Sequence, residues 1–380
     1  MANGKCFSIK GHQLKHNKTG FSFHTVVLLG KILNGGLQMK RNIIDKIHTL
    51  QSNKEFSGTA FVKNEDQVIV EVSYGYSNRS EQIKNQTDTR YGIASGCKLF
   101  TSIAICQLVE EGEISFDSTI RDCLDVKFPH FDETITIHHL LTHTSGIPDY
   151  FDEEIMDDFE ELWIKNPMYH IRCLKDFLPL FQNEDMKSAV GERFHYNNAG
   201  YILLGLIVEQ ASGLTFTDYV EKRIFKKAGM LDSGYFAFDS LPERVALGYI
   251  DNADGTWKTN VYSLPVKGGS DGGAFVTVTD MSRFWEALIN YRLINKALTI
   301  QLLTAQTQVK ENSFYGYGLW IKKNGNLISK YHIMGYDPGV SFHSAYYPDS
   351  SSKVVVCSNK SEGAFSIMNG IEEELSKVKI

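Results

Sequence analysis

The chain has 380 residues, of which 42% are hydrophobic and 22% are charged, and its formal net charge is −6. This composition is typical of a globular protein and excludes a collagen-like or wholly disordered chain. The acidic balance leaves no surplus of Lys and Arg to neutralise phosphates, so we expect no nucleic-acid partner.

Residues 1–38 are interpreted as a leader, either disordered or not native, that precedes a domain spanning 39–380. The apolar segment Phe21–Gly30 resembles part of a signal peptide, but His24 interrupts it and no A-x-A cleavage site follows. No run of 18 apolar residues occurs, so no membrane-spanning helix is predicted. The six cysteines form no C-x-x-C pair. Their scatter favours free thiols and a cytoplasmic protein, with export as the alternative.

The patterning after residue 39 predicts strands near both ends of the domain and helices between them. The predicted helices are Ile43–Leu50, Lys98–Glu111, Tyr201–Gln210 and Phe365–Lys377. The predicted strands are Ser57–Val62, Val68–Val72, Tyr317–Lys322, Leu327–Tyr331, Gly339–Tyr346 and Lys353–Ser358. Together they predict an α/β (α+β) fold in which an antiparallel sheet, built from both chain termini and flanked by helices, carries an inserted helical lobe. The sheet lobe would span about 39–90 and 265–380, and the helical lobe about 91–264.

The first candidate for chemistry is Ser95-Gly96-Cys97-Lys98, at the start of the predicted helix 98–111. A Ser and a Lys three residues apart on a helix share one face. An amine in a desolvated pocket can accept the proton of a hydroxyl nucleophile, and the N–H of Ser95 can help to bind an oxyanion. The S-x-x-K spacing also occurs at Ser350 and Ser376. The motif alone therefore leaves a helix-capping serine beside a solvated lysine as the alternative.

The second candidate segment is Phe194–Gly205, FHYNNAGYILLG. Tyr196 and Asn198 alternate just before a helix, so both side chains can point the same way. A phenol beside an ammonium can act as a general acid or base, and an amide side chain can bind a substrate amide. The alternative is a tyrosine that packs beneath a loop and an asparagine that caps the following helix.

The third segment is His332–Val340, HIMGYDPGV. A glycine at 335 lets a substrate backbone lie close to the sheet edge, and the N–H of Tyr336 is a candidate second oxyanion donor. The loop Gly268–Gly273 lacks the Lys-Ser/Thr of a phosphate-binding loop, and the acidic stretch Asp149–Glu161 is interpreted as a solvated helix face or a lid.

In this order the segments resemble the serine β-lactamase and penicillin-binding-protein superfamily, on its class C β-lactamase, DD-peptidase and esterase side. The likeness covers about 45–375 and is carried by Tyr91–Ile120, Ile137–Tyr150, Phe194–Gly213 and Gly272–Phe284. The resemblance implies an acyl-enzyme on Ser95, with Lys98 as proton acceptor and Tyr196 as proton shuttle. It also implies that Asn198 binds the substrate amide, that the N–H groups of Ser95 and Tyr336 bind the oxyanion, and that no metal or cofactor is needed.

The third motif departs from the family pattern, which has K-T-G or H-x-G before P-G. Counting back from Pro338-Gly339 places Gly335 correctly but puts Ile333 where the cation is expected. His332 precedes that position by one residue, and a β-bulge would be needed to bring it to the site. A missing cation disfavours carboxylate substrates, both β-lactams and D-Ala-D-Ala peptides. The acidic stretch, if it rims the cleft, disfavours anions further.

Two functions are compatible with this pattern. One is a serine hydrolase that acts through an acyl-enzyme on a β-lactam, a D-amino-acid peptide or a carboxylic ester. The other is a penicillin-binding-type module that captures a ligand with negligible turnover. The presence of Ser95, Lys98, Tyr196 and Asn198 together favours the enzyme. The expected partner is a small-molecule or peptide substrate, and the sequence gives no indication of the oligomeric state.

Overall fold

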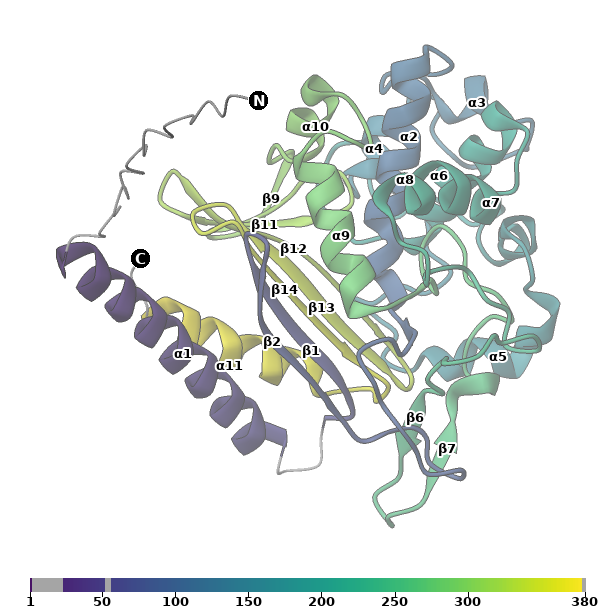
Figure 1. Cartoon of the computed structure of the whole chain (residues 1–380). Helices are drawn as coiled ribbons and strands as arrows, with labels where there is room; N and C mark the ends of the chain where they lie inside the picture. The colour runs from purple at the N-terminus through teal and green to yellow at the C-terminus, as the bar shows by residue number, and fades with distance from the viewer. Residues whose placement is uncertain (2–22, 52–55, 378–380) are drawn as a thin grey trace.

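The computed structural model describes Met1 and residues 23–51 and 56–377. Within these residues, a central antiparallel sheet of eight strands has the order β2-β1-β14-β13-β12-β11-β10-β9 (Figure 1). The strands come from both ends of the chain, as predicted: β1 Gly58–Asn64, β2 Gln67–Tyr74, β9 Thr307–Lys310, β10 Ser313–Tyr315, β11 Trp320–Asn324, β12 Leu327–Asp337, β13 Val340–Tyr347 and β14 Ser352–Ser358.

Two helices cover one face of this sheet: α1 (Phe23–Gln51) and α11 (Ala364–Lys377) (Figure 1). Ile43 and Ile47 of α1 and Ile367 and Ile371 of α11 are buried in one apolar cluster with alternate residues of β1 and β14. The period of four on each helix and of two on each strand explains why these elements form a layer. The expected fold class is therefore confirmed.

The helical lobe packs on the opposite face, behind α9 (Val278–Ile289) (Figure 1). Its core helices, α2 (Lys98–Glu111) and α6 (Asn198–Ser212), are buried on nearly every side over their first eleven residues. A helix that is surrounded in this way belongs to the interior of a large core. The remaining helices are α3 Ile120–Cys123, α4 Ile137–Leu141, α5 Leu162–Lys165, α7 Phe216–Val220, α8 Lys226–Ala228 and α10 Lys296–Leu302.

Three small strand pairs complete the lobes: β3 (Tyr76–Asn78) with β4 (Ile83–Lys84), β5 (Tyr91–Gly92) with β8 (Phe275–Val276), and β6 (Tyr249–Asp251) with β7 (Trp257–Thr259). The described cysteines are free, and Cys6 lies outside the described residues. In the part of the chain that the structure covers, no single helix is long and apolar enough to cross a membrane.

Several boundaries differ from the sequence predictions. The boundary at residue 39 falls inside α1, which begins at Phe23, while residues 2–22 of the predicted leader lie outside the described residues. The predicted strand 317–322 is replaced by β10 and β11, with a turn at Gly318 (φ +76°) that a side chain would not allow, because its Cβ would lie 2.7 Å from the carbonyl oxygen of Lys98. Strand β12 continues past Tyr331 to Asp337, and α9 and α10 occupy residues for which no helix was predicted.

Candidate active site

Ser95 lies in a short 3-10 helix, Ala94–Cys97, that leads directly into α2. The preceding residue, Ala94, has a φ of +45°, a left-handed conformation that is unfavourable for a residue with a side chain. Its carbonyl accepts a hydrogen bond from the N–H of Gly273, at 3.3 Å. The loop that contains Gly273 therefore holds the strained backbone immediately before the serine.

The ammonium group of Lys98 is buried and contacts three oxygen atoms. Its Nζ lies 2.9 Å from Ser95 Oγ, 2.8 Å from Asn198 Oδ1 and 2.7 Å from the carbonyl oxygen of Asp271. The amide and carbonyl oxygens can only accept hydrogen bonds. When Lys98 is a neutral amine, these two acceptors take its two N–H groups, and its lone pair is left to face the hydroxyl of Ser95. These contacts would therefore point the lone pair of a neutral Lys98 amine towards the hydroxyl of Ser95.

Tyr196 completes the group from the opposite side. Its ring lies beside the amine, with Lys98 Nζ 4.9 Å from the ring centroid. The same ring is stacked beside Trp320, with centroids 6.3 Å apart and planes inclined by 13°. Burial raises the pKa of Tyr196, because the phenolate would lose hydration. Burial alone would lower the pKa of Lys98, but the neighbouring Tyr196 and Asp271 outweigh it and raise that pKa. The resting site therefore holds Lys98 as an ammonium and Tyr196 as a neutral phenol, so Lys98 has to release one proton before it can accept the proton of Ser95.

Asn198 occupies the first position of α6 and is fixed through both ends of its amide. The oxygen contacts Lys98, while Nδ2 lies 3.3 Å from Asp149 Oδ2. The Asp149 carboxylate also accepts the N–H groups of Asn198 and Ala199 at 2.6 and 2.9 Å. A carboxylate on these free N–H groups stabilises the start of a helix. Burial nevertheless raises the pKa of Asp149 to about 7.

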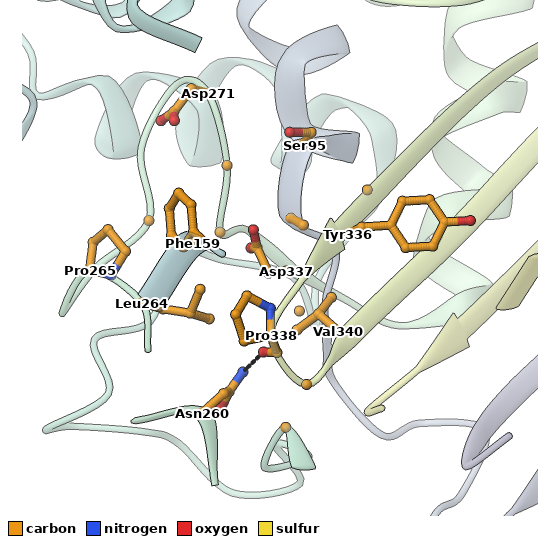
Figure 2. A pocket seen from close by; sticks show the side chains of 18 of the residues that line it. Ser95, Phe159, Asn260, Leu264, Pro265, Asp271, Tyr336, Asp337, Pro338 and Val340 are labelled. Carbon is orange, nitrogen blue, oxygen red and sulfur yellow. Dashed lines mark hydrogen bonds between the residues drawn. The ribbon is translucent and has the colours of Figure 1, made fainter. Parts of the chain in front are cut away.

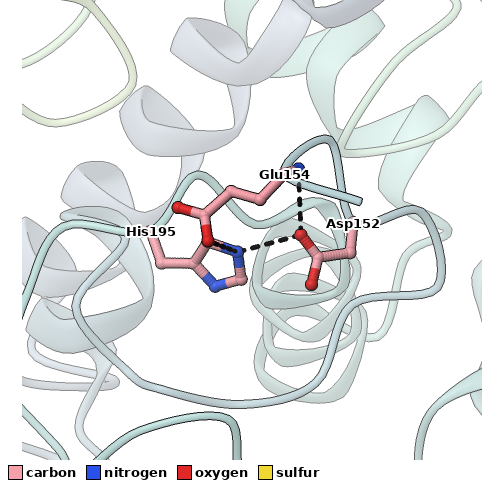
Figure 3. A group of neighbouring side chains, drawn as sticks. All are labelled: Asp152, Glu154 and His195. Atoms are coloured by element: carbon pink, nitrogen blue, oxygen red, sulfur yellow. Dashed lines mark hydrogen bonds and ion pairs between the residues drawn. The ribbon is translucent and has the colours of Figure 1, made fainter. Parts of the chain in front are cut away.

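A second polar group ties the 149–154 loop to the segment that carries Tyr196 (Figure 3). His195 Nε2 lies 3.1 Å from Asp152 Oδ1 and 3.6 Å from Glu154 Oε2, and Arg193 pairs with Glu154 through both guanidinium N–H groups. His195 and Asp152 are buried. Their contact fixes the loop relative to the phenol, so it supports the position of Tyr196.

Strand β12 passes very close to the serine at Gly335. A Cβ built on Gly335 would lie 2.1 Å from the carbonyl oxygen of Ile93 and 2.8 Å from the backbone nitrogen of Ser95. Only glycine allows this approach. It places the backbone after Gly335, including Tyr336, beside the N–H of Ser95. The ring of Tyr336 points away from the cleft (Figure 2), and its hydroxyl contacts His343 Nε2 at 2.5 Å.

His332 is not brought to this site. Its ring is buried next to Trp320, with centroids 6.5 Å apart, and the residue is not among those that line the cleft. It pairs with Trp320 and Ala345 across the sheet, and neither pairing is shifted at His332, so the bulge that would have moved it is absent there. Burial lowers the pKa of His332 well below its ordinary value, so the ring is neutral. The expected cation position holds the buried Ile333.

The cleft in front of Ser95 has a volume of about 680 Å³. Its walls are largely aromatic and aliphatic, as in most sites for small molecules; they include Phe151, Phe159, Phe177, Phe238, Leu264, Pro265, Phe275, Trp320 and Met334. The charged residues of its lining are mainly acidic: Glu153, Asp157, Asp158, Asp271 and Asp337. The lining also contains one basic residue, Lys267. The ammonium of Lys267 contacts Thr217 at 3.1 Å.

The sequence motifs did not indicate Asp271 and Asp337, which both line the cleft. Asp271 belongs to the glycine-rich loop 268–273, which lacks the Lys-Ser/Thr of a phosphate-binding loop and packs against the backbone of Ser95. A Cβ on Gly272 would lie 3.9 Å from Ser95 N. The clustered glycines were the available signal, because such loops allow close backbone approach. Asp337 stood beside Pro338-Gly339, which was used only to align the third motif.

Comparisons with known proteins agree with this geometry. The family model described as Beta-lactamase matches residues 44–374. Penicillin-binding protein 4* of Bacillus subtilis is 30% identical over 346 residues, covering 86% of this chain and 73% of that protein. The crystal structure of a penicillin-binding protein from Bacillus halodurans is 60% identical with a TM-score of 0.83, covering 86% of this chain and 99% of that one. An octameric penicillin-binding protein homologue from Pyrococcus abyssi is 26% identical with a TM-score of 0.78, covering 88% and 77%.

Proposed function

This chain belongs to the Beta-lactamase family, which makes it a serine hydrolase at the level of the family; from that premise we propose that it hydrolyses an amide or ester through an acyl-enzyme on Ser95. The observation that carries the proposal is the contact of Lys98 Nζ with Ser95 Oγ at 2.9 Å, beside the phenol of Tyr196. Nucleophile, base and proton shuttle are thus within reach of one another in one cleft.

Acylation begins when Ser95 Oγ attacks the carbonyl carbon and its proton passes to Lys98. The negative charge that develops on the carbonyl oxygen is placed between the backbone of Ser95 and that of Tyr336, whose N–H groups are the proposed oxyanion donors. Tyr196 then delivers a proton to the leaving amine or alkoxide as the tetrahedral intermediate collapses. Lys98 then passes the proton that it took from Ser95 to the Tyr196 phenolate. Both groups thereby regain the protonation states with which acylation began.

Deacylation repeats these steps with water as the nucleophile. Water attacks the acyl carbon, the Tyr196–Lys98 pair accepts its proton, and the Ser95 oxygen leaves with a proton from the same pair. The acyl product departs as a carboxylic acid. Ser95 and Lys98 are already in contact in the resting site, and the ring of Tyr196 lies beside Lys98, which supports steps without a large rearrangement.

The test is hydrolysis of p-nitrophenyl butyrate together with labelling by a fluorophosphonate probe, in wild type and Ser95→Ala. We expect wild type to turn over the ester and to take up one probe per chain, and Ser95→Ala to do neither. A matched control is Ser102→Ala, which also lies on α2 and whose hydroxyl donates to the carbonyl of Lys98. Wild-type rates in Ser95→Ala would refute the proposal.

The altered third motif supports a second candidate, a module that captures a ligand without turnover. Ile333 supplies no cation to hold a substrate carboxylate, so a carboxylate ligand would be poorly placed for deacylation. Intact-mass spectrometry after exposure to benzylpenicillin and to the ester separates the two. A persistent acyl adduct with both compounds supports capture, and return to the free mass within minutes supports hydrolysis.

A further inference from the structure

We propose that Asp337 is a specificity-determining residue that binds a protonated amine next to the scissile carbonyl of the substrate. The inference rests on the proposed function, because it names the substrate class of the same cleft. That class is an amide or ester of an amino acid or peptide with a free amino group and an apolar side chain. It is the opposite charge type from the carboxylate substrates that a third-motif cation would hold.

Asp337 is placed by the same strand that approaches the nucleophile. It follows Gly335 by two residues on β12, so both residues face the same side of the sheet. Two residues of a strand span roughly 6.6 Å. The distance from a carbonyl carbon to its α-amine, plus one charge-assisted hydrogen bond, is about 5 Å. These two lengths are comparable, and Ser95 and Asp337 line one cleft, so the α-amine of a substrate held at Ser95 would lie near this carboxylate.

The Asp337 carboxylate has no partner within the protein. It accepts no hydrogen bond and forms no ion pair in the parts of the chain that the structure describes. It points into the cleft between Ser95, Phe159 and Asp271 (Figure 2). By contrast, Asp271 is bonded to the hydroxyl of Tyr150, and Asp149 caps α6. Of these three carboxylates, Asp337 is the one that has no partner among the described residues and is therefore available to a ligand.

The surroundings favour a cation at this point. The charged groups that act on Asp337 are Asp271 from the glycine-rich loop, Glu153 from the rim and Lys98 from α2. Burial and the repulsion from Asp271 raise the pKa of Asp337 to about 8. An ammonium bound here would favour the ionised form of Asp337, because it would place a positive charge next to the carboxylate. The ammonium of Lys98 already serves three other oxygens.

The rest of the cleft specifies the apolar part of the substrate. Phe159, Leu264 and Pro265 line the same cleft as Asp337 and offer apolar surface to a side chain of the substrate. A small number of polar groups within an apolar wall is the usual arrangement that fixes the orientation of a ligand. Here the carboxylate would orient the amine and the apolar wall would receive the side chain.

The experiment compares two esters that differ only in the amine: phenylalanine p-nitrophenyl ester, in both enantiomers, and 3-phenylpropionic acid p-nitrophenyl ester. The quantity measured at pH 7.0 is the ratio of kcat/KM for the amine ester to kcat/KM for the deamino ester. Wild type is compared with Asp337→Asn and with Asp349→Asn. Asp349 is exposed in the turn between β13 and β14 and loses the same charge far from the cleft.

For at least one enantiomer we expect the ratio to exceed about 10 in wild type and in Asp349→Asn, and to fall by about 10- to 100-fold in Asp337→Asn, as for loss of a charge-assisted hydrogen bond. Asp337→Ser gives the same reading if the Asn variant does not fold. An unchanged ratio in both variants, with deamino hydrolysis still dependent on Ser95, overturns this inference alone. Deamino hydrolysis that survives Ser95→Ala overturns the proposed function instead.

Discussion

Strand β12 approaches the proposed nucleophile, Ser95, at Gly335, and Gly335→Ala tests whether that approach is needed. The added methyl would lie 2.1 Å from the carbonyl oxygen of Ile93 and 2.8 Å from Ser95 N. Both are rigid backbone atoms, so β12 and the 3-10 helix must separate by about 1 Å to reach an ordinary contact. Overpacking of this kind costs roughly 1–3 kcal/mol of stability. A displacement of about 1 Å at a catalytic group can cost about 100-fold in rate.

We therefore expect Gly335→Ala to lower kcat/KM for p-nitrophenyl butyrate by about 100-fold or more and to slow fluorophosphonate labelling in parallel. Its thermal unfolding midpoint should fall by only a few degrees, since a loss of 1 kcal/mol shifts Tm by about 2 °C in a chain of this size. Gly36→Ala is the control, because a Cβ at Gly36 meets nothing within 4 Å. Hydrolysis at the wild-type rate by a folded Gly335→Ala variant would show that the separation of β12 from Ser95 does not matter.

Three further outcomes follow from the contacts of the site. Tyr196→Phe keeps the ring beside Trp320 but removes the phenol hydroxyl, so kcat in the ester assay should fall by about 100- to 1,000-fold. Tyr201→Phe is the control: it loses a hydroxyl that is bonded to the carbonyl of Leu141, and it should retain activity in the same assay. Asp152→Ala leaves buried His195 without its 3.1 Å contact, and urea denaturation should show a loss of about 1–3 kcal/mol in unfolding free energy. The raised pKa of Asp337 means that wild type loses stability as pH rises from about 4 towards 8; Asp337→Asn should therefore gain in Tm relative to wild type at pH 9 but not at pH 4, and equal differences at both pH values would contradict this assignment.

The α2 helix and its serine were predictable because the signals are local. The apolar residues of Lys98–Glu111 and the terminal Gly112 give the observed bounds, and Gly112 adopts the left-handed φ of 78° that ends a helix. The spacing of Ser95 and Lys98 fixes their mutual orientation through helix geometry alone. The positions of Tyr196 and Asn198 next to Lys98 could not be predicted from local signals, because they depend on how two distant segments pack. The resemblance to a family supplied that information.

The contribution of the glycine-rich loop could not be predicted in the same way. The hydrogen bond from Lys98 goes to the backbone carbonyl of Asp271, a group that every residue possesses, so this contact leaves no signal in the sequence. The location of His332 also depends on tertiary context. One residue of register decides whether a strand side chain faces the site, and only the pairing of β12 with its neighbours shows that His332 does not.

The residues near the end of β12 determine which substrate charge the cleft would favour. A family member with a cation at the position of Ile333 presents a positive group beside the nucleophile, whereas this chain presents an apolar residue there and a carboxylate at Asp337, four residues later. At an effective dielectric constant near 20, a unit charge about 4 Å from another contributes about 4 kcal/mol before desolvation is subtracted. The change of charge therefore has two effects. Ile333 removes the attraction for anions that a cation would provide, and Asp337 adds an attraction for cations. Even if desolvation removes half of each contribution, the remaining difference of about 4 kcal/mol corresponds to a change of roughly 1,000-fold in the preference for an amine over a carboxylate, relative to such a family member. An apolar cleft with this charge at its end would accept the amine of one substrate and exclude the carboxylate of another without any change in the Ser95–Lys98–Tyr196 chemistry.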